Sequence, residues 1–321
     1  MSNQSAPTIN DRIKENISLK EFTTFRIGGA ARYFFVANDS DELQQALDYA
    51  AKNKLNYFIL GGGSNILVSD AGFNGLVIKL SNNYFKFRDN IMECGAGLPL
   101  SKALGESLSA GLTGLEWAAG IPGTIGGAIH GNAGAYGGEM GLNIKEVIVL
   151  RNGKIKKLRN KDCLFVYRDS LFKNENNHDI ILSAVMQLKK ASQAELDAAK
   201  EKIMKIIKER AQKFKGFSAG SAFKNIVLSE REIKEFKAEH PRLPEQFVEY
   251  RKIPAAWLIE ECELKGRTIG GAKVSENHAG IITSDGAASA ENVIMLISII
   301  KQKVRQKFNL ELMEEIEYIG F

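Results

Sequence analysis

The stretch YFILGGGSN, residues 57–65, decides the class of fold that this chain adopts. Its first four residues are apolar, as in a short buried strand, and they run directly into three glycines, a serine and an asparagine. Glycine lets backbone N–H groups approach an anion closely and accepts positive φ without a steric penalty. We therefore interpret residues 61–65 as a candidate phosphate-binding turn, although a plain tight turn is the commoner role of a single glycine cluster.

A second glycine cluster, GIPGTIGGAIHGNAGAYGG, follows at residues 120–138. Neither of the two commonest nucleotide-binding patterns is present, because Ile66 occupies the third glycine position of GxGxxG and no GxxxxGK precedes a serine or threonine. Two clusters in one half of the chain nevertheless strengthen the case for nucleotide binding. Asn65 and Asn132 add polar side chains that suit a flavin or a pyrophosphate.

Short strands alternate with helices around these turns, which predicts an α+β fold. Helix starts are marked by capping side chains such as Asp39, with Glu42 as its capping-box partner. The last helix carries apolar residues from Val293 to Phe308 at the spacing of one buried face. Further strands are predicted at 32–36, 75–80, 147–150, 180–188 and 310–319, and further helices at 99–110, after the caps Ser192 and Ser229, and from Pro254 to Gly266.

Length and composition limit the classes of protein to consider. A chain of 321 residues exceeds the usual size of one hydrophobic core, so two or three domains are expected. The formal charge of +5 comes from 43 basic and 38 acidic residues, which is too mild to predict a nucleic-acid partner and is compatible with an anionic small substrate. Cys94, Cys163 and Cys262 lack the spacing of a zinc site or disulfide framework, which favours a reducing compartment.

The sequence carries no sign of a membrane partner. Residues 1–16 are polar and lack the apolar core of a secretory signal, and no run approaches the ~20 apolar residues of a membrane span. A cytoplasmic protein is therefore expected. One basic helix carries Lys205, Lys208, Arg210 and Lys213, which we interpret as a solvated face in preference to a contact with a substrate phosphate.

Taken singly, the other polar residues indicate little about chemistry. Arg168 can bind a carboxylate with both arms of its guanidinium, but a surface ion pair is the usual role of a lone arginine. Ser221 lacks the GxSxG pattern of a hydrolase nucleophile and has no evident triad partners, which disfavours hydrolase chemistry. For His278 a structural hydrogen bond is favoured.

Taken in order, however, the motifs resemble the UDP-N-acetylenolpyruvoylglucosamine reductase family along nearly the whole chain. Each motif is weak alone, but their ordered combination is specific. The motifs are TFRIGG at 24–29, LGGGSNILVSDAGFNGLVI at 60–78, GLEWAAGIPGTIGGAIHGNAGAYGGE at 114–139, YRDS at 167–170, GSAFKN at 220–225, GGAKVSENHAG at 270–280 and LMEEI at 312–316.

The resemblance implies a fold, a cofactor and a site without metal. The implied fold is a two-subdomain FAD-binding fold of the vanillyl-alcohol-oxidase or PCMH-like type, with subdomains at 1–80 and 81–200, followed by a separate α+β substrate-binding domain at 201–321. The implied flavin-binding residues are Gly61, Gly62, Gly63, Ser64, Asn65, Pro122, Gly123, Thr124, Gly127, Asn132 and Ala133, the catalytic residues are Ser221, Arg168 and Glu315, and the substrate-binding residues are Tyr136, Tyr167, Lys224, Asn225 and His278.

The implied reaction is the NADPH-dependent, FAD-mediated reduction of UDP-N-acetylglucosamine enolpyruvate to UDP-N-acetylmuramate, a step of peptidoglycan precursor synthesis and thus of cell wall biogenesis, cell shape and cell division. Arg168 would hold the substrate carboxylate, Glu315 would hydrogen-bond the enolate, and Ser221 would donate a proton to the carbanionic carbon. Lys224 would assist that transfer. The partner is a small nucleotide sugar, and a monomer is expected.

The sequence departs from the family's common pattern in two places. Ile226 stands where proline often follows the Lys-Asn pair, and residues 227–252 resemble an insertion, for which surface decoration is favoured over a cover for the site. The short spacing from Arg168 to Ser221 resembles the family's more compact subtype. Two alternatives remain open, namely a flavin-dependent oxidase of small alcohols or lactones and a flavin- or nucleotide-sugar-binding protein without turnover.

Overall fold

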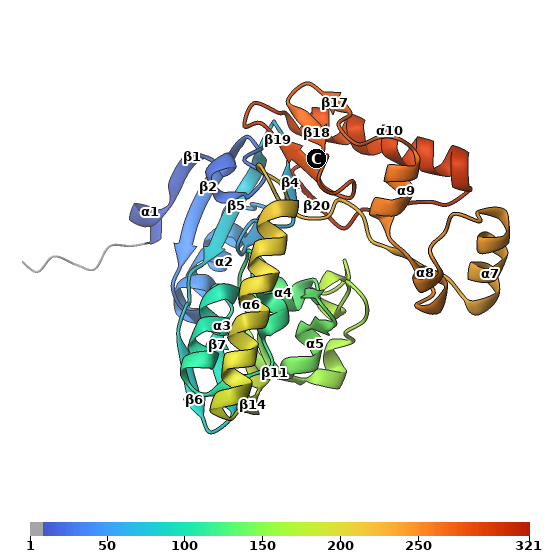
Figure 1. Ribbon diagram of the computed structural model, residues 1–321. Coiled ribbons are helices and arrows are strands. Elements are labelled where there is room, and N and C mark those ends of the chain that lie inside the picture. Colours follow the sequence, from blue (N-terminus) through green and yellow to red (C-terminus); the bar gives the residue numbers. More distant parts are fainter. Residues whose placement is uncertain (1–8) are drawn as a thin grey trace, which may run out of the picture. The chain divides into compact units, whose positions relative to one another are not determined.

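A computed structural model describes residues 9–321, and its tertiary contacts divide the chain into two compact units (Figure 1). Each unit collects more than one stretch of sequence. Unit 1 comprises the described residues up to Ser18 together with Ala30–Gly63 and Phe73–Ala211, and unit 2 comprises Leu19–Gly29, Ser64–Gly72 and Gln212–Phe321. The domain boundaries at residues 80 and 200 stay predictions.

The first sheet of unit 1 is mostly parallel and follows the order β1-β2-β5-β3. Its central strand, β5, is buried at Leu76, Val77 and Ile78, as expected of a parallel strand covered on both faces. Helix α2 packs against β2 and β5 through Leu43 and Ala46. The elements are β1 (Lys14–Ser18), β2 (Ala30–Ala37), α2 (Ser40–Lys52), β3 (Tyr57–Leu60) and β5 (Phe73–Leu80), with α1 (Ile9–Arg12) ahead of them.

The start of α2 is capped as predicted, but only in part. The Asp39 side chain accepts a hydrogen bond from the Glu42 N–H at 2.8 Å. The Glu42 carboxylate does not close the expected box onto Asp39. It accepts instead from the Asn38 backbone and side chain and from the Arg12 guanidinium, because Arg12 offers two donors to its two oxygens.

This ion pair makes the stability of the protein pH-dependent in the acid range. The hydrogen bond from Arg12 lowers the pKa of Glu42 from 4.5 to about 2. Because the folded-state pKa lies below the unfolded one, the pair stabilises the protein fully above pH 4.5, and its contribution is lost as pH falls to about 2. Glu42→Gln should therefore lower the free energy of unfolding at pH 7 by about 1 kcal/mol, and this difference should vanish near pH 2 in urea titrations.

Glu235→Gln is the matched control for that experiment. Glu235 contacts Arg231 at 3.6 Å with both side chains largely in solvent, so its removal should change the free energy of unfolding by only a few tenths of a kcal/mol at any pH. A loss in Glu42→Gln that is the same at pH 7 and pH 2 would contradict the assignment.

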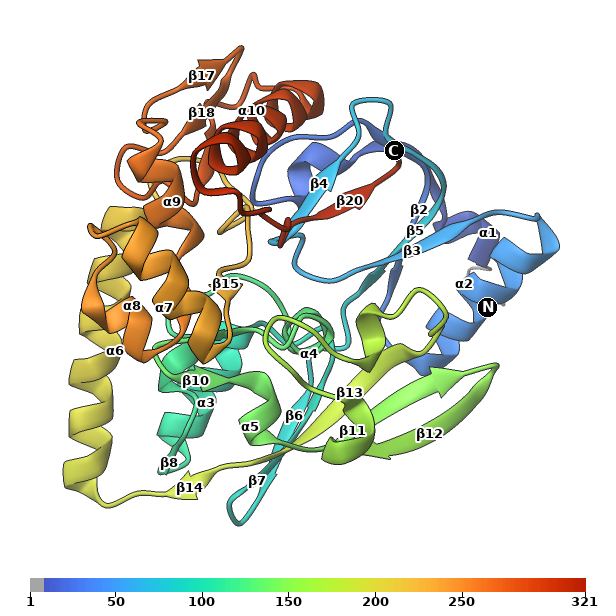
Figure 2. The ribbon, with the colours of Figure 1, turned by 90° about the vertical axis from the view of Figure 1, so that its right-hand side faces the viewer.

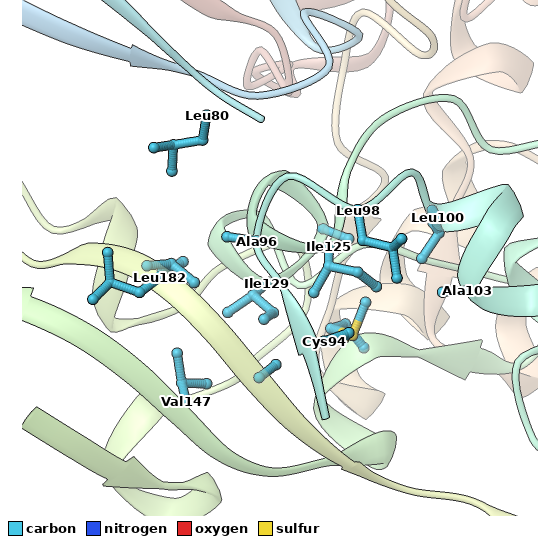
Figure 3. Packing of buried hydrophobic residues seen from close by; sticks show 14 of the residues in the cluster. Leu80, Cys94, Ala96, Leu98, Leu100, Ala103, Ile125, Ile129, Val147 and Leu182 are labelled. Atoms are coloured by element: carbon cyan, nitrogen blue, oxygen red, sulfur yellow. The ribbon is translucent and has the colours of Figure 1, made fainter. Parts of the chain in front are cut away.

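The second sheet of unit 1 is antiparallel throughout, in the order β12-β11-β13-β7-β6. Helix α4 packs onto it, and Figure 3 shows Ile125 and Ile129 of that helix among Leu98, Cys94 and Val147. The elements are β6 (Phe85–Arg88), β7 (Ile91–Gly95), α3 (Leu100–Ser109), α4 (Ile125–His130), β11 (Ile144–Arg151), β12 (Lys154–Arg159), β13 (Ile180–Gln187) and α6 (Gln193–Lys213). Of these, α3, β11, β13 and the start of α6 lie within three residues of their predicted places, whereas β6, β7, β12 and α4 were not predicted.

Unit 2 has its core around the last helix, α10 (Ala290–Phe308), which buries the predicted face from Val293 to Phe308. A three-stranded sheet and α9 pack against α10. A distant segment of sequence completes the unit, because β4 (Ile66–Val68) pairs in parallel with the final strand, β20 (Glu317–Ile319) (Figure 2). The remaining elements of this core are α9 (Ala255–Glu261), β17 (Thr268–Ile269), β18 (Ala272–Val274) and β19 (Ile282–Ser284).

The segment at residues 227–252 contributes to the core of unit 2. It leaves and re-enters through the paired strands β15 (Ile226–Val227) and β16 (Lys252–Ile253), and it contains α7 (Glu230–Glu239) and α8 (Glu245–Glu249). Ser229 and Glu232 form the predicted capping box of α7. Ile233, Phe236 and Leu243 are buried in the same cluster as α10, so the segment is more than surface decoration.

Two predicted boundaries are wrong. The helix that follows Pro254 ends at Glu261 and not at Gly266, because Glu263 already adopts a left-handed conformation with φ of 57°. The strand predicted at 310–319 shrinks to Glu317–Ile319, because the chain before it makes only an isolated bridge between Phe223 and Glu314. A local pattern does not reveal such a loss of pairing.

Short strands and helices connect the longer elements. Among residues 9–321, every helix is too short or too polar to cross a lipid bilayer, and the polar segment at 1–16 lies partly outside the described residues. The same part of the chain holds no cluster of three potential metal ligands. The short strands are β8 (Leu112–Thr113), β9 (Gly134–Ala135), β10 (Gly138–Glu139) and β14 (Lys189–Lys190), and the short helices are α5 (Met140–Asn143) and the 3-10 turns Leu19–Phe22, Glu116–Ala118, Asn160–Cys163 and Leu171–Lys173.

Candidate active site

The two glycine clusters meet in unit 1. A Cβ placed on Gly62 would lie 2.5 Å from the Cα of Gly123, and one placed on Gly61 would lie 2.9 Å from the Thr124 hydroxyl. Side chains at these positions would therefore force the two turns apart. Thr124 also caps α4, since its Oγ1 accepts from the N–H of Gly127. The sequence alone could not reveal that the clusters form one surface.

Helix α4 presents a bare backbone face. Gly127 is exposed and Gly131 lies one turn further on, and neither has positive φ. An added Cβ on either would make only an ordinary contact, at 3.7 Å for Gly127 and 3.8 Å for Gly131. Glycine is thus required there neither by conformation nor by packing, although it weakens a helix. This backbone face is therefore open to a ligand lying flat against it.

Lys79 brings a positive charge to the same turn. It is paired with Leu60 in the parallel register of β3 and β5, so its Nζ reaches the carbonyl of Gly61 at 3.3 Å. Partial burial lowers the pKa of its ammonium group. No motif identifies Lys79 as a site residue, because a lone lysine within an apolar strand carries no local signal.

Arg168 sits at a conformationally demanding position in a tight turn of unit 1. The N–H of Val166 donates to the carbonyl of Asp169, and the N–H of Asp169 donates to that of Val166, both at 3.1 Å. Arg168 has φ of 56°, whereas Tyr167 is not among the positive-φ residues, as in a type II turn that usually takes glycine or asparagine at this place. Strained backbone of this kind clusters at functional sites.

Asn132 and Ser170 hold this turn to the end of α4. The Nδ2 of Asn132 donates to the carbonyl of Val166 at 2.8 Å, and the hydroxyl of Ser170 donates to the carbonyl of His130 at 2.6 Å. Asn132 is completely buried, and its Oδ1 accepts from the N–H of Gly141. Both polar atoms of its side chain, Oδ1 and Nδ2, therefore form hydrogen bonds within the protein.

Tyr136 and Arg210 form a second polar group in unit 1. Burial raises the pKa of the Tyr136 phenol, and the nearby Glu209 carboxylate raises it further. Arg210 departs from the solvated face predicted for its helix, because its Nε donates to the carbonyl of Gly120 at 2.9 Å. Burial lowers the pKa of Arg210, and the charge of Arg168 lowers it further. The positive charges of Arg168 and Arg210 repel each other, and an anion bound beside them would reduce this repulsion.

The other two predicted catalytic residues come together in unit 2. Ser221 pairs with Ile281 in an isolated bridge, and the next carbonyl, that of Ala222, accepts from the N–H of Glu315 at 2.9 Å. Asn65 completes the arrangement, since its Nδ2 donates to the carbonyl of Glu315 at 3.0 Å. Ser221 and Glu315 are thus on hydrogen-bonded neighbouring segments, although 94 positions separate 221 from 315 in the sequence.

Three predicted substrate-binding residues, Lys224, Asn225 and His278, also belong to unit 2. The N–H of Lys224 donates to the carbonyl of Met313, which continues the pairing next to Glu315. The Oδ1 of Asn225 accepts from the N–H of Ala255 at 3.2 Å and so caps α9. His278 is partly buried, which lowers its pKa, and its Nδ1 makes no hydrogen bond within the described chain. The favoured structural hydrogen bond is therefore not made through that atom.

Comparison with known proteins bears on what these groups do. Residues 31–159 match the FAD binding domain family model, and residues 210–319 match the C-terminal domain model of UDP-N-acetylenolpyruvoylglucosamine reductase. The UDP-N-acetylenolpyruvoylglucosamine reductase of Clostridium novyi (strain NT) is 36% identical over 314 residues, which cover 97% of this chain and 93% of that protein. The chain belongs to the UDP-N-acetylenolpyruvoylglucosamine reductase family.

Other members of the reductase family agree over nearly the full length. That of Caldicellulosiruptor bescii is 39% identical over 306 residues, covering 94% of this chain and 89% of that protein. The crystal structure of the reductase from Thermus caldophilus has 29% identity and a TM-score of 0.75, and the match covers 96% of this chain and 99% of that one. The expected FAD-binding fold with a separate C-terminal α+β domain is confirmed.

Membership in the reductase family also confirms the class of enzyme. The chain is an FAD-dependent oxidoreductase, and the match to the FAD binding domain at 31–159 includes both glycine clusters. The predicted catalytic residues fall in both units, Arg168 in unit 1 and Ser221 with Glu315 in unit 2. Their individual roles stay predictions.

Proposed function

We propose that this chain reduces UDP-N-acetylglucosamine enolpyruvate to UDP-N-acetylmuramate, with NADPH as the source of electrons and FAD as the carrier. The observation that carries the proposal is that Ser221 and Glu315 lie on neighbouring segments, joined by the hydrogen bond from the Glu315 N–H to the carbonyl of Ala222, the residue after Ser221. Reduction of an enol ether needs a proton donor and a partner for the enolate. An oxidase of small alcohols or lactones needs no such pair. Family membership supports the same choice.

The proposed flavin site uses both glycine clusters of the sequence. FAD, when bound, supplies the hydride that side chains cannot provide. The open face of α4 at Gly127 leaves room for it, and Lys79 places a cation beside Gly61, where it can balance the anionic groups of the cofactor. The side chains of Asn65 and Asn132 donate to the backbone carbonyls of Glu315 and Val166 respectively.

Arg168 is proposed to bind the carboxylate of the enolpyruvyl group. Its planar guanidinium can bond both carboxylate oxygens, and negative charge on the substrate grows as hydride reaches the methylene carbon. The arginine therefore interacts more strongly with the transition state than with the ground state. The charge of Arg210 adds to the same anion-attracting surroundings.

Ser221 and Glu315 are proposed to complete the addition of hydrogen. Hydride arrival at the methylene carbon leaves an electron pair on the neighbouring carbon, delocalised into the carboxylate. The Glu315 side chain would hydrogen-bond this enolate, and the Ser221 hydroxyl would give its proton to the carbon. A serine hydroxyl is a weak acid, but an enolate carbon is a strong base, so the transfer is feasible. Lys224 lies three positions on and would assist it.

The nucleotide-sugar part of the substrate is assigned to Tyr136, Tyr167, Asn225 and His278. Its phosphates are anionic, which suits a chain with an excess of basic residues. We place the reaction in peptidoglycan precursor synthesis in the cytoplasm, with the protein acting as a monomer.

A glycine substitution tests the flavin site. Gly127→Ala fits the helix without a clash, so the flavin-free protein should gain about 0.5–1 kcal/mol in free energy of unfolding. The same methyl group would stand against bound FAD and should raise its Kd by roughly 10- to 100-fold. Calorimetric unfolding and FAD titration measure the two opposite effects.

Gly105→Ala is the control for the flavin test. Gly105 lies on α3, and a Cβ there would meet nothing within 4 Å. This variant should gain the same stability and bind FAD like the wild type. If Gly127→Ala also keeps wild-type affinity, the flavin does not lie on that face of α4.

The function itself is tested by anaerobic flavin absorbance. NADPH should bleach the flavin bands of the purified protein, and UDP-N-acetylglucosamine enolpyruvate should restore them. Recovery with oxygen only would support the oxidase. Failure of NADPH to bleach bound flavin would support a binding protein without turnover, and failure to bind FAD would overturn the proposal.

A further inference from the structure

The turn that carries Arg168 needs external support. A residue with a Cβ is disfavoured at φ of 56°, so the isolated turn would relax toward negative φ and swing the guanidinium away. Only contacts from outside the turn can offset this preference. The cation–π contact between Arg168 and Tyr167, at 5.5 Å, comes from within the turn and cannot supply that support.

Asn132 provides the support at the first residue of the turn. The carbonyl of Val166 accepts from the N–H of Asp169 within the turn and from the Nδ2 of Asn132 outside it. The asparagine is itself rigidly placed, because it is fully buried and its Oδ1 accepts from the N–H of Gly141. The Asn132 amide therefore fixes Val166, the first residue of the turn, relative to the segment that follows α4.

Ser170 holds the other end of the same turn. Its hydroxyl donates to the carbonyl of His130, which lies two residues before Asn132. Both ends of the turn are thus attached to residues 130–132, immediately after α4. A turn held at both ends can keep a strained central residue that a turn held at one end would release.

We propose that Asn132 is a positioning residue for Arg168, holding the guanidinium where it meets the carboxylate of the substrate. The inference rests on the proposed function. It gives Asn132 a role distinct from flavin binding, because its polar side-chain atoms are already engaged within the protein. Positioning of this kind acts on the step in which charge develops, and a displacement of about 1 Å can slow that step about 100-fold.

Asn132→Asp tests the proposal with little change of shape. The aspartate keeps an oxygen that can accept from Gly141 and loses the Nδ2–H donors that hold Val166. NADPH should still bleach the flavin at the wild-type rate, whereas reoxidation by the enolpyruvyl substrate should slow by about 10- to 100-fold. Asn143→Asp is the matched control, because the Nδ2 of that buried asparagine also donates to a backbone carbonyl, that of Gly114, and its Oδ1 also accepts, from Trp117.

A double-mutant cycle separates positioning from a general structural effect. In an Arg168→Ala background, Asn132→Asp should slow reoxidation less than about twofold further, since the group it positions is already gone. Ser170→Ala should show the same coupling to Arg168→Ala. Because it buries no charge, it keeps the test available if Asn132→Asp does not fold. Multiplicative losses in both cycles would overturn the proposal.

Binding of the product gives a readout independent of turnover. Asn132→Asp should weaken binding of UDP-N-acetylmuramate, which bears the carboxylate, and leave that of UDP-N-acetylglucosamine, which lacks it, unchanged by calorimetry. Equal loss for both ligands would overturn the positioning role. A wild-type enzyme that does not turn over the enolpyruvyl substrate would instead overturn the proposed function, so the two failures are distinguishable.

Discussion

Ser221→Ala should leave the reduction of bound flavin by NADPH at the wild-type rate and slow its reoxidation by the enolpyruvyl substrate roughly 10²- to 10⁴-fold. The substitution removes the proposed proton donor and nothing that the first half-reaction needs. The backbone arrangement should survive, since Ser221 pairs with Ile281 and its neighbour Ala222 pairs with Glu315 through main-chain atoms. Stopped-flow absorbance measures the two half-reactions separately.

Ser218→Ala is the natural comparison for that variant. It removes the same hydroxyl three residues upstream, and the carbonyl of Ser218, which accepts from the Thr24 hydroxyl, is retained. Both half-reactions should then match the wild type. If Ser221→Ala slowed flavin reduction and reoxidation equally, Ser221 would not be the proton donor.

Arg168→Lys should lower the rate of flavin reoxidation by roughly 10²- to 10³-fold while positive charge is kept. Lysine can offer one ammonium group in place of two parallel N–H donors, so the carboxylate loses its bidentate contact. A φ of 56° is as unfavourable for lysine as for arginine, so the substitution does not change the backbone strain of the turn. The comparison therefore isolates the shape of the cationic group.

Arg151→Lys makes the same chemical change at a distant ion pair of unit 1. Arg151 contacts the Asp179 carboxylate through two nitrogens, as Arg168 is proposed to contact the substrate. Its replacement should lower the free energy of unfolding by about 1.5–3 kcal/mol, because the buried Asp179 carboxylate loses one hydrogen bond, and should leave both half-reactions intact. If Arg168→Lys reoxidised flavin like the wild type, the substrate carboxylate would have to bind elsewhere.

Local sequence patterns predicted the longer helices and the eight-residue strands because the forces that set them are local. A cap such as Asp39 or Ser229 acts within one helical turn, so its neighbours are sufficient to identify it. The end of the helix after Pro254 was mispredicted because Glu263 adopts the left-handed conformation that is usual for glycine. The last strand was overextended because pairing partners decide where a strand stops.

The candidate site was predictable only as far as the resemblance reached. No local rule links Asn65 to Glu315, which lies 250 positions away along the chain, or Lys79 to the glycine turn. Arg210 was placed on a solvated face because helical periodicity cannot distinguish it from Lys205 or Lys208. Its contact with Gly120 requires the folded chain.

The division of the chain into interleaved segments has a consequence for biosynthesis. Residues 64–72 belong to unit 2, where β4 pairs with β20 and Asp70 accepts from the N–H groups of Ala290 and Glu291 at the start of α10. These early residues leave the ribosome long before their partners exist. Unit 2 can therefore assemble only when translation is nearly finished, and the segment must stay unpaired until then. A fragment beginning near residue 212 would lack β4 and the Asp70 carboxylate that accepts from two N–H groups of α10.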